Sequence, residues 1–197
     1  MKKDLLLIGG GGHCKSCIDV IECQDVFAIA GIIDLDSAKD NVLGYPFLGG
    51  DQDLEHLRSK YDYALITIGH ILDSSVRARV YKNLVDIGYQ MPAVISPRAY
   101  VSKHSTVGSG TIVMHNATLN AGAVVGNNCI INTNSLIEHD AIVGDDCHIS
   151  TGAIINGDCR IISGTFVGSN AVVKHSAETK KGDFIKAGSL FKGYVND

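Results

Sequence analysis

An aliphatic residue returns at every sixth position through the second half of the chain. An α-helix repeats about every 3.6 residues and a flat strand about every two, so neither maintains this spacing. A parallel β-helix does, because each six-residue unit forms one side of a triangular coil. The repeat continues through thirteen units: Val101, Val107, Val113, Leu119, Val125, Ile131, Ile137, Val143, Ile149, Ile155, Ile161, Val167 and Val173.

A small residue stands two positions before each aliphatic residue, as at Ala117, Ala123 and Cys129. We expect the aliphatic side chain to fill a corner of the prism and the small one to fit the tight interior beside it. A Gly often follows the aliphatic residue, as at Gly108 and Gly126, and we expect it to let the backbone turn. Three units make a coil of eighteen residues, so thirteen units predict a little over four coils.

The first 95 residues follow a different pattern, in which apolar strands alternate with amphipathic helices. This alternation predicts a small parallel sheet of Rossmann-like topology. We therefore expect two domains, over residues 1–95 and 96–197, with Pro92 and Ser96-Pro97 marking the passage between them. The expected strands cover residues 4–8, 26–33, 63–68 and 89–95, and the expected helices cover 15–23, 51–60 and 74–87.

Composition and charge exclude several classes of protein. A length of 197 residues suits one or two small domains, and a net charge of −4 gives no basic surface for nucleic acid. No apolar run approaches membrane-spanning length, and Met1 leads into a short strand rather than a signal peptide. We therefore expect a cytoplasmic protein with neither a nucleic-acid nor a membrane partner.

The six cysteines fit a reducing compartment. Cys129 and Cys147 fall one coil apart in the same interior column, so we interpret them as small core residues with free thiols. Cys14 and Cys17 have the spacing of a redox pair, but they begin an amphipathic helix and a packing role is favoured there. We expect no bound metal.

A run of glycines, Gly9 to Gly12, joins the first strand to the first helix and is followed by His13. Such a turn lets phosphate oxygens approach backbone N–H groups and the positive end of a helix. Asp34 and Asp36 follow the second strand, where a dinucleotide fold holds a ribose. The half-sheet is short, so a mononucleotide-type ligand is favoured over NAD. The glycines could equally make only a tight turn.

Together, these two signals resemble the bacterial nucleotide-sugar N-acetyltransferases of the bacillosamine and perosamine pathways, which share a family with sialic-acid O-acetyltransferases. The resemblance covers nearly the whole chain. It implies a left-handed β-helix, a homotrimer with acetyl-CoA bound between subunits, and an N-terminal domain that binds a nucleotide-linked amino sugar. Its motifs are Ile8–His13, Ile32–Asp34, Ile66–Gly69, Ile95–Ala99, Asn132–Asp140, Gly144 and His148–Ser150.

The resemblance also implies roles for residues of the repeat domain. His139 matches the general base, and Asp140 stands where an acidic residue orients that base. Asn132 matches an Asn near the acetyl group, and His148 matches a second recurrent His that we assign to cofactor binding. Lys186, Ala187 and Gly188 fall where CoA contacts are expected, although the usual Gly-x-Pro-Ala is absent there.

In the N-terminal domain, the resemblance places the diphosphate on Gly9, Gly12 and His13. Asp34 and Asp36 fall near its base-binding or ribose-binding acids. Gly69 and His70 are expected to contact the substrate, but His70 replaces a common Asn and a longer loop follows it. The nucleotide stays open among UDP, dTDP and GDP, and the resemblance to bacillosamine-type enzymes favours UDP.

The chemistry can also be argued from the residues themselves. Making an amide from a thioester requires a base for the amine proton and a donor for the developing oxyanion. His139 lies between two carboxylates, and Gly157 follows eighteen residues later, one coil above it, where its N–H is a candidate oxyanion donor. His148 lies half a coil from His139, on another face, so the two could cooperate only across an interface. Without the resemblance, His139 would be interpreted as a surface residue.

Three other functions compete with N-acetyl transfer. O-acetyl transfer needs the same base, and the sequence does not distinguish an amine from a hydroxyl acceptor. A β-helix carbonic anhydrase needs a His-x4-His pair, and no two histidines here are five positions apart. A non-catalytic sugar-nucleotide binding protein is disfavoured by the acidic residues around His139. The remaining histidines are interpreted as surface residues: His56, His104, His115 and His175.

Overall fold

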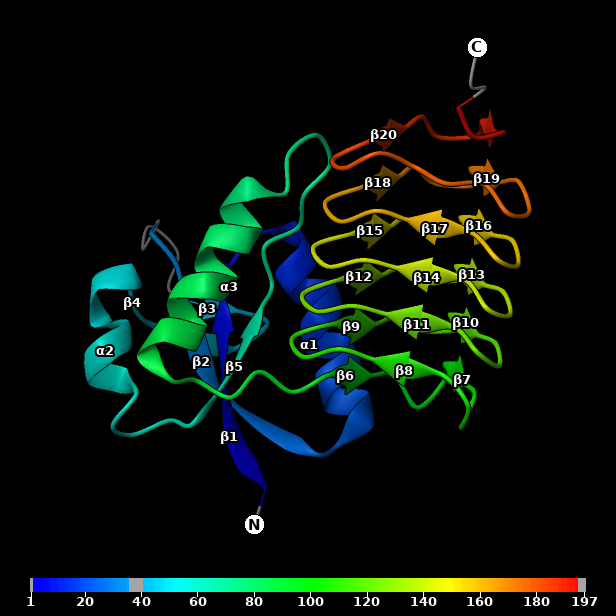
Figure 1. Ribbon diagram of the computed structural model, residues 1–197. Coiled ribbons are helices and arrows are strands. Elements are labelled where there is room, and N and C mark those ends of the chain that lie inside the picture. Colours follow the sequence, from blue (N-terminus) through cyan, green and yellow to red (C-terminus); the bar gives the residue numbers. More distant parts are fainter. Residues whose placement is uncertain (1, 36–40, 195–197) are drawn as a thin grey trace.

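The computed structural model describes residues 2–35 and 41–194. Figure 1 shows an α/β domain beside a stack of coils that runs from green at the first coil to red near the C-terminus. No helix in the described ranges is long and apolar enough to cross a bilayer.

The N-terminal sheet has the strand order β3-β4-β2-β1-β5. β1, β2, β4 and β5 run parallel, and only β3 pairs antiparallel. The strands are β1 (Lys3–Ile8), β2 (Phe27–Ile33), β3 (Asn41–Val42), β4 (Tyr45–Gly49) and β5 (Tyr63–Ile66). The parallel strand β4 was missing from the prediction, because Pro46 and the flanking glycines are residues typical of a turn.

Helices cover both faces of this sheet. α1 (Gly12–Gln24) packs on one face, whereas the 3-10 turn η1 (Asp51–Asp53), α2 (Leu54–Leu57) and α3 (Ser75–Ile87) lie on the other. The helix predicted for residues 51–60 is therefore shorter than expected. α3 ends at Gly88, whose φ of +96° is the left-handed conformation that glycine adopts without strain.

The strand predicted over residues 89–95 is wrong as a single element. Gln90 forms an isolated parallel bridge to Tyr63 beside β5, whereas Val94 and Ile95 pair with the β-helix. Pro92, which has no N–H to donate, separates the two pairings. The first coil therefore begins just before the expected boundary at residue 96.

The C-terminal domain is a parallel β-helix built from two-residue strands on three sides. Partners lie eighteen residues apart, as in the pairing of Thr118 with Leu136. Side one contains β6 (Val94–Ile95), β9 (Ile112–Val113), β12 (Ile130–Ile131), β15 (His148–Ile149), β18 (Phe166–Val167) and β20 (Phe184–Ile185). Side two contains β7 (Tyr100–Val101), β10 (Thr118–Leu119), β13 (Leu136–Ile137), β16 (Ile154–Ile155), β19 (Val172–Val173) and β21 (Leu190–Phe191). Side three contains β8 (Thr106–Val107), β11 (Val124–Val125), β14 (Ile142–Val143) and β17 (Arg160–Ile161).

The repeated aliphatic residues and the small residues before them form the interior core of this prism. The glycines that follow the aliphatic residues have a different role from the one expected. A Cβ on Gly108 would lie 2.5 Å from the backbone of Gly126, so these glycines allow neighbouring coils to approach closely. The left-handed turn residue comes two positions later, as at Gly110 with φ +68° and Asn128 with φ +55°.

The two domains share a packed junction. Cys14, Cys17 and Ile18 of α1 join one buried cluster with Ile112 and Ile130 on side one. Beside this cluster, the fully buried guanidinium of Arg77 donates hydrogen bonds to the carbonyls of Ile66, Ile68 and Asn128 at 2.8, 2.8 and 3.0 Å. A buried cation thus bridges the end of β5 and a turn of the β-helix, which fixes how the domains are docked.

Candidate functional site

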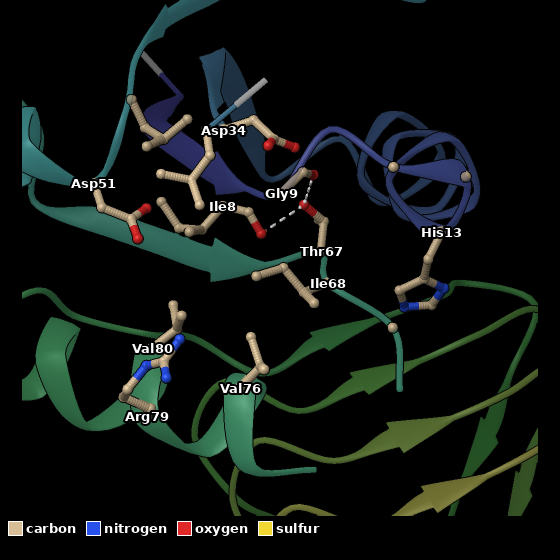
Figure 2. Close-up of a pocket in the computed structure, with 15 residues that line it drawn as sticks. Ile8, Gly9, His13, Asp34, Asp51, Thr67, Ile68, Val76, Arg79 and Val80 are labelled. Carbon is tan, nitrogen blue, oxygen red and sulfur yellow. Dashed lines mark hydrogen bonds between the residues drawn. The ribbon is translucent and has the colours of Figure 1, made fainter. Parts of the chain in front are cut away.

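A cavity of about 500 Å³ opens at the carboxyl ends of β1, β2 and β5. Figure 2 shows its walls: the glycine turn, Asp34 after β2, Thr67 after β5, and Val76 and Arg79 from α3. The carboxyl edge of a parallel sheet is where α/β domains ordinarily bind their ligands. The position of this cavity therefore agrees with a ligand site at the glycine turn.

The four glycines of the turn fall into two pairs. A Cβ on Gly9 would lie 2.5 Å from Ile68, and one on Gly10 would lie 2.7 Å from the Phe47 ring, so the fold itself needs these two. Apart from adjacent residues and the backbone of α1, no atom of the described residues lies within 4 Å of a Cβ placed on Gly11 or Gly12. These last two stand at the start of α1, where N–H groups and the helix dipole favour an anion. Close packing against Ile68 and Phe47 explains the first pair, and open space for a ligand remains at the second.

Asp34 both holds the glycine turn and faces the cavity. Its Oδ2 accepts a hydrogen bond of 2.5 Å from the Gly10 N–H, and it also lines the cavity. Asp36, which was expected to act beside it, lies outside the described residues. The sequence prediction missed Asp51 and Arg79, which also line the cavity. Arg79 is exposed and brings a positive charge to the cavity, but as one basic residue on a polar helix face it gave no signal in the sequence.

Three histidines gather where the N-terminal domain meets side one. The ring of His148 lies 5.5 Å from that of His70 and 6.5 Å from that of His13. Burial, followed by repulsion from Arg77 and the neighbouring imidazoles, lowers the pKa of His13 from 6.5 to about 3. Burial also lowers the pKa values of His70 and His148 to about 4, so all three rings are neutral near pH 7.

The hydrogen bonds of His148 fix its tautomer. Its Nδ1 lies 2.7 Å from the carbonyl oxygen of His70, which can only accept, so Nδ1 carries the proton. Its Nε2 then accepts from the Asn132 side-chain amide at 3.1 Å. Nε2 of His13 and both ring nitrogens of His70 are buried without a hydrogen-bond partner among the described residues. This cluster therefore keeps unused polar atoms for a bound molecule.

His139 lies in a contrasting place, on an exposed turn after β13. Its Nδ1 is 2.9 Å from Asp140 Oδ2, and the two side chains are 59% and 69% exposed. The hydrogen bond to Asp140, together with the charges of Asp140, Glu138 and Asp158, raises the pKa of His139 above 6.5. Asp140 is itself the left-handed residue of its turn, with φ +60°. The turn that the repeat requires thus also brings the carboxylate to the imidazole.

Gly157 lies against the His139 ring, as the eighteen-residue spacing predicted. A Cβ on Gly157 would be 2.7 Å from His139 Nε2, and the ring of His175, one coil further, is centred 6.4 Å from that of His139. The absence of a side chain at Gly157 therefore makes room for the imidazole. Its role as an oxyanion donor stays a prediction.

The chain does not bring all the predicted residues into one cluster. Gly9, Gly12, Asp34 and Gly69 line or adjoin the cavity, and His13 connects it with His70, His148 and Asn132. His139, Asp140 and Gly157 lie where side two leads into side three. Lys186, Ala187 and Gly188 are exposed on the turn after β20, where side one leads into side two of a later coil.

Family comparisons match both domains. The PglD N-terminal domain family matches residues 4–84, and the bacterial transferase hexapeptide family, which contains six repeats, matches residues 104–139 and 122–157. Among curated proteins, no significant sequence match is found.

Solved structures match the chain over its length. The acetyltransferase domain of PglB from Neisseria gonorrhoeae is 27% identical, with a TM-score of 0.91 over 100% of this chain and 94% of that one. The same domain in complex with acetyl coenzyme A is 26% identical, with a TM-score of 0.89 over 98% and 95% of the two chains. A variant of perosamine N-acetyltransferase from Caulobacter crescentus, in complex with CoA and GDP-perosamine, is 28% identical, with a TM-score of 0.70 over 95% and 92%. These matches confirm the expected fold, a Rossmann-like domain followed by a left-handed β-helix.

Proposed function

We propose that the chain is a hexapeptide-repeat sugar acetyltransferase with a PglD-type N-terminal domain, and that it acetylates the 4-amino group of a nucleotide-linked amino-dideoxy sugar. Acetyl-CoA is the acetyl donor, as the ligands of the PglB and perosamine enzymes indicate. The observation that carries the proposal is the His139–Asp140 pair, which leaves an imidazole nitrogen free on the β-helix surface.

We propose that His139 is the general base. Its Nδ1–H donates to Asp140, so Nε2 holds the lone pair that accepts a proton from the sugar amine. The amine nitrogen attacks the thioester carbonyl carbon and the C–S bond breaks. The proton held on Nε2 then passes to the departing sulfur, so CoA leaves as the thiol and the imidazole is neutral again. Gly157 lies against the His139 ring, and its N–H is our candidate donor to the developing oxyanion.

We further propose that the active site forms between subunits of a homotrimer. His139 is more than half exposed and lies on a different side of the prism from His148 and the N-terminal cavity. A neighbouring chain would bring its Asn132–His148 pair and its cavity to this histidine. Lys186, Ala187 and Gly188 would then contact CoA, and the reaction would take place in the cytoplasm.

The N-terminal cavity is the proposed binding site for the sugar nucleotide. Its diphosphate would occupy the open space at Gly11 and Gly12, with His13 beside it, and Arg79 would add positive charge. Asp34 and Asp51 offer acceptors for a base N–H or a ribose hydroxyl. Gly69 and His70 would face the sugar. UDP is the nucleotide we favour, whereas the perosamine enzyme holds a GDP-sugar.

Release of the CoA thiol tests the function directly, using UDP-, GDP- and dTDP-linked 4-amino sugars with acetyl-CoA. We expect rapid release with one nucleotide class and a product heavier by one acetyl group. An amide product survives mild alkali and hydroxylamine, whereas an ester is cleaved, so the same product distinguishes N- from O-acetyl transfer. Absence of thiol release with every amino sugar and with sialic acid would leave a binding protein as the alternative.

Calorimetric titration of UDP, GDP and dTDP tests the cavity separately. In Gly12→Leu, the new Cβ meets open space among the described residues, so we expect the variant to fold normally. The added side chain should weaken nucleotide binding at least tenfold, about 1.4 kcal/mol. Asp34→Ala should change the preference among the three nucleotides. Equal binding of all three, unaffected by either substitution, would place nucleotide recognition elsewhere.

A further inference from the structure

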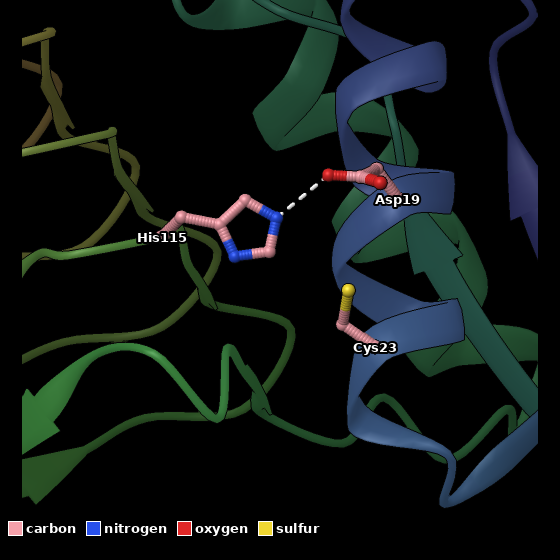
Figure 3. Close-up of side chains that lie close together, drawn as sticks. All are labelled: Asp19, Cys23 and His115. Atoms are coloured by element: carbon pink, nitrogen blue, oxygen red, sulfur yellow. Dashed lines mark hydrogen bonds and ion pairs between the residues drawn. The ribbon is translucent and has the colours of Figure 1, made fainter.

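Three side chains with metal-ligating atoms meet at the domain junction, away from the residues assigned to acetyl transfer. Figure 3 shows Asp19 and Cys23 on α1 with the His115 imidazole pointing toward them from the β-helix turn after β9. One ligand atom from each residue lies within 4.8 Å of the other two. His115 Nε2 is already 2.7 Å from Asp19 Oδ2.

The two residues on α1 have the spacing of a helical metal site. Positions four apart lie on the same face of a helix, one turn above the other, as in helical motifs that present two zinc ligands. Asp19 and Cys23 satisfy this spacing and are both exposed, so small side-chain rotations can bring their ligand atoms together. The helix backbone therefore presents an oxygen and a sulfur toward one point.

His115 is held in the orientation that a metal ligand needs. Its Nδ1 lies 2.6 Å from Ser96 Oγ, and the same oxygen accepts a hydrogen bond of 3.0 Å from the Arg98 N–H. Ser96 is buried, and its hydroxyl can accept the Nδ1 proton when an ion takes the place of the proton between Nε2 and Asp19. A partner on the far nitrogen that fixes the tautomer is the usual support of a metal-ligating histidine.

Cys23 differs from the other cysteines of the chain. Cys14, Cys17, Cys129, Cys147 and Cys159 are buried, whereas Cys23 is a free, exposed thiol. The buried thiols pack in the two cores, but Cys23 lies outside both core clusters. Packing in these cores therefore does not account for Cys23, which lies near an imidazole and a carboxylate instead.

We propose that Asp19, Cys23 and His115 bind a divalent transition-metal ion, for which Zn²⁺ is the best chemical match. Zn²⁺ accepts thiolate, imidazole and carboxylate ligands in one tetrahedral site, and water can occupy the fourth position. The ion replaces the proton between His115 Nε2 and Asp19, and it displaces the proton of the Cys23 thiol. It joins α1 to the β-helix, so its role is structural and acetyl transfer needs no metal.

Cobalt is the probe for this site, because a thiolate ligand gives Co²⁺ an intense charge-transfer absorption in the near ultraviolet. Titration of the reduced, full-length protein with Co²⁺ should produce this band and saturate at one ion per chain. Cys23→Ser should remove the band. Asp19→Asn and His115→Asn should weaken Co²⁺ binding at least tenfold, and Ser96→Ala about tenfold through the orientation of His115.

His104→Asn is the matched control, because His104 is an exposed histidine on another turn of the same β-helix and belongs to no ligand cluster among the described residues. It should bind Co²⁺ like the wild type. Zn²⁺ should displace Co²⁺ and raise the melting temperature of the wild type but not of Cys23→Ser. A wild-type protein without the charge-transfer band, or a band that survives Cys23→Ser, would overturn the proposal. Acetyl transfer by metal-free protein is expected in either case.

Discussion

Two groups of histidines in this chain occupy opposite environments. Where the domains meet, His70 and His148 are buried and His13 is half-buried. Loss of contact with water lowers their pKa values to between about 3 and about 4. His139 is exposed beside Asp140, which raises its pKa. The same side chain is therefore held neutral in one region and made a stronger base in the other. The first region suits hydrogen bonding to a ligand, and the second suits removal of a proton.

The largest expected effect is a loss of turnover when the exposed histidine His139 is removed. His139→Ala should lower kcat by about 10²–10⁴-fold, the usual range for loss of a general base. CoA binding and oligomeric state should be unchanged, since the side chain is exposed. His175→Ala removes a ring 6.4 Å away from His139 and serves as the control, with near wild-type turnover expected. Near wild-type turnover by His139→Asn would instead remove His139 from the mechanism.

A smaller loss is expected from crowding the same imidazole without removing it. In Gly157→Ala, the new methyl group would lie 2.7 Å from His139 Nε2 and would displace the ring. Misplacement of a catalytic group by about 1 Å can cost about 10²-fold, so we expect a fall of that size in kcat. The melting temperature should change little, because the ring can move into solvent. Unchanged kinetics would show that the observed ring position is not the reactive one.

The pH profile tests the basicity of His139. The hydrogen bond and charge of Asp140 favour the protonated imidazole, so the acidic limb of kcat/KM should have its midpoint above pH 6.5. Asp140→Asn removes that preference and should shift the limb to lower pH, with a loss of turnover milder than that of His139→Ala. Asp158→Asn removes the weakest of the three carboxylate charges that raise the pKa of His139, so it should shift the limb less. A limb that stays in place in Asp140→Asn would assign it to another group.

The smallest expected effect is on the stability of the protein at acidic pH, which tests the histidines where the domains meet. The folded state lowers the pKa of His148 from 6.5 to about 4, so the unfolded chain binds more protons between these values. The contribution of the neutral ring is fully present above about pH 6.5 and is lost as the pH falls toward about 4. His148→Gln should therefore make the melting temperature fall less steeply over this interval. The control His56→Gln, at an exposed position in α2, should follow the wild type.

The sequence predicted the repeat domain better than the N-terminal domain. Thirteen hexads specify the strands, the core and the contact of Gly157 with His139, because a fixed eighteen-residue register converts sequence spacing into position. In the N-terminal domain, β4 was not predicted, and the division of residues 89–95 between two pairings was not predicted either. Neither feature follows a local hydrophobic period. Arg77 did leave a signal: a charge three residues before Val80 on the apolar face of α3.

Contacts between the domains could not be predicted in this way. His115 was expected on the surface, yet it meets Asp19 from a position 96 residues away. His70 and His148, separated by 78 residues, are likewise joined only by the docking of the domains. Spacing within a repeat fixes positions inside that repeat, whereas the docking angle depends on buried groups such as Arg77.

The close coil contacts at Gly108 and Gly126 have a consequence for how the chain can change in length. Each coil touches only its neighbours, and every column repeats after eighteen residues. Insertion or deletion of whole coils, in multiples of eighteen residues, after the last N-domain contact would leave every column in register. A change by any other length would move the following side chains to a different side or position of the prism. The prism can thus be lengthened by whole-coil duplication, and the distance from His139 to the C-terminal turn can vary without rebuilding the fold.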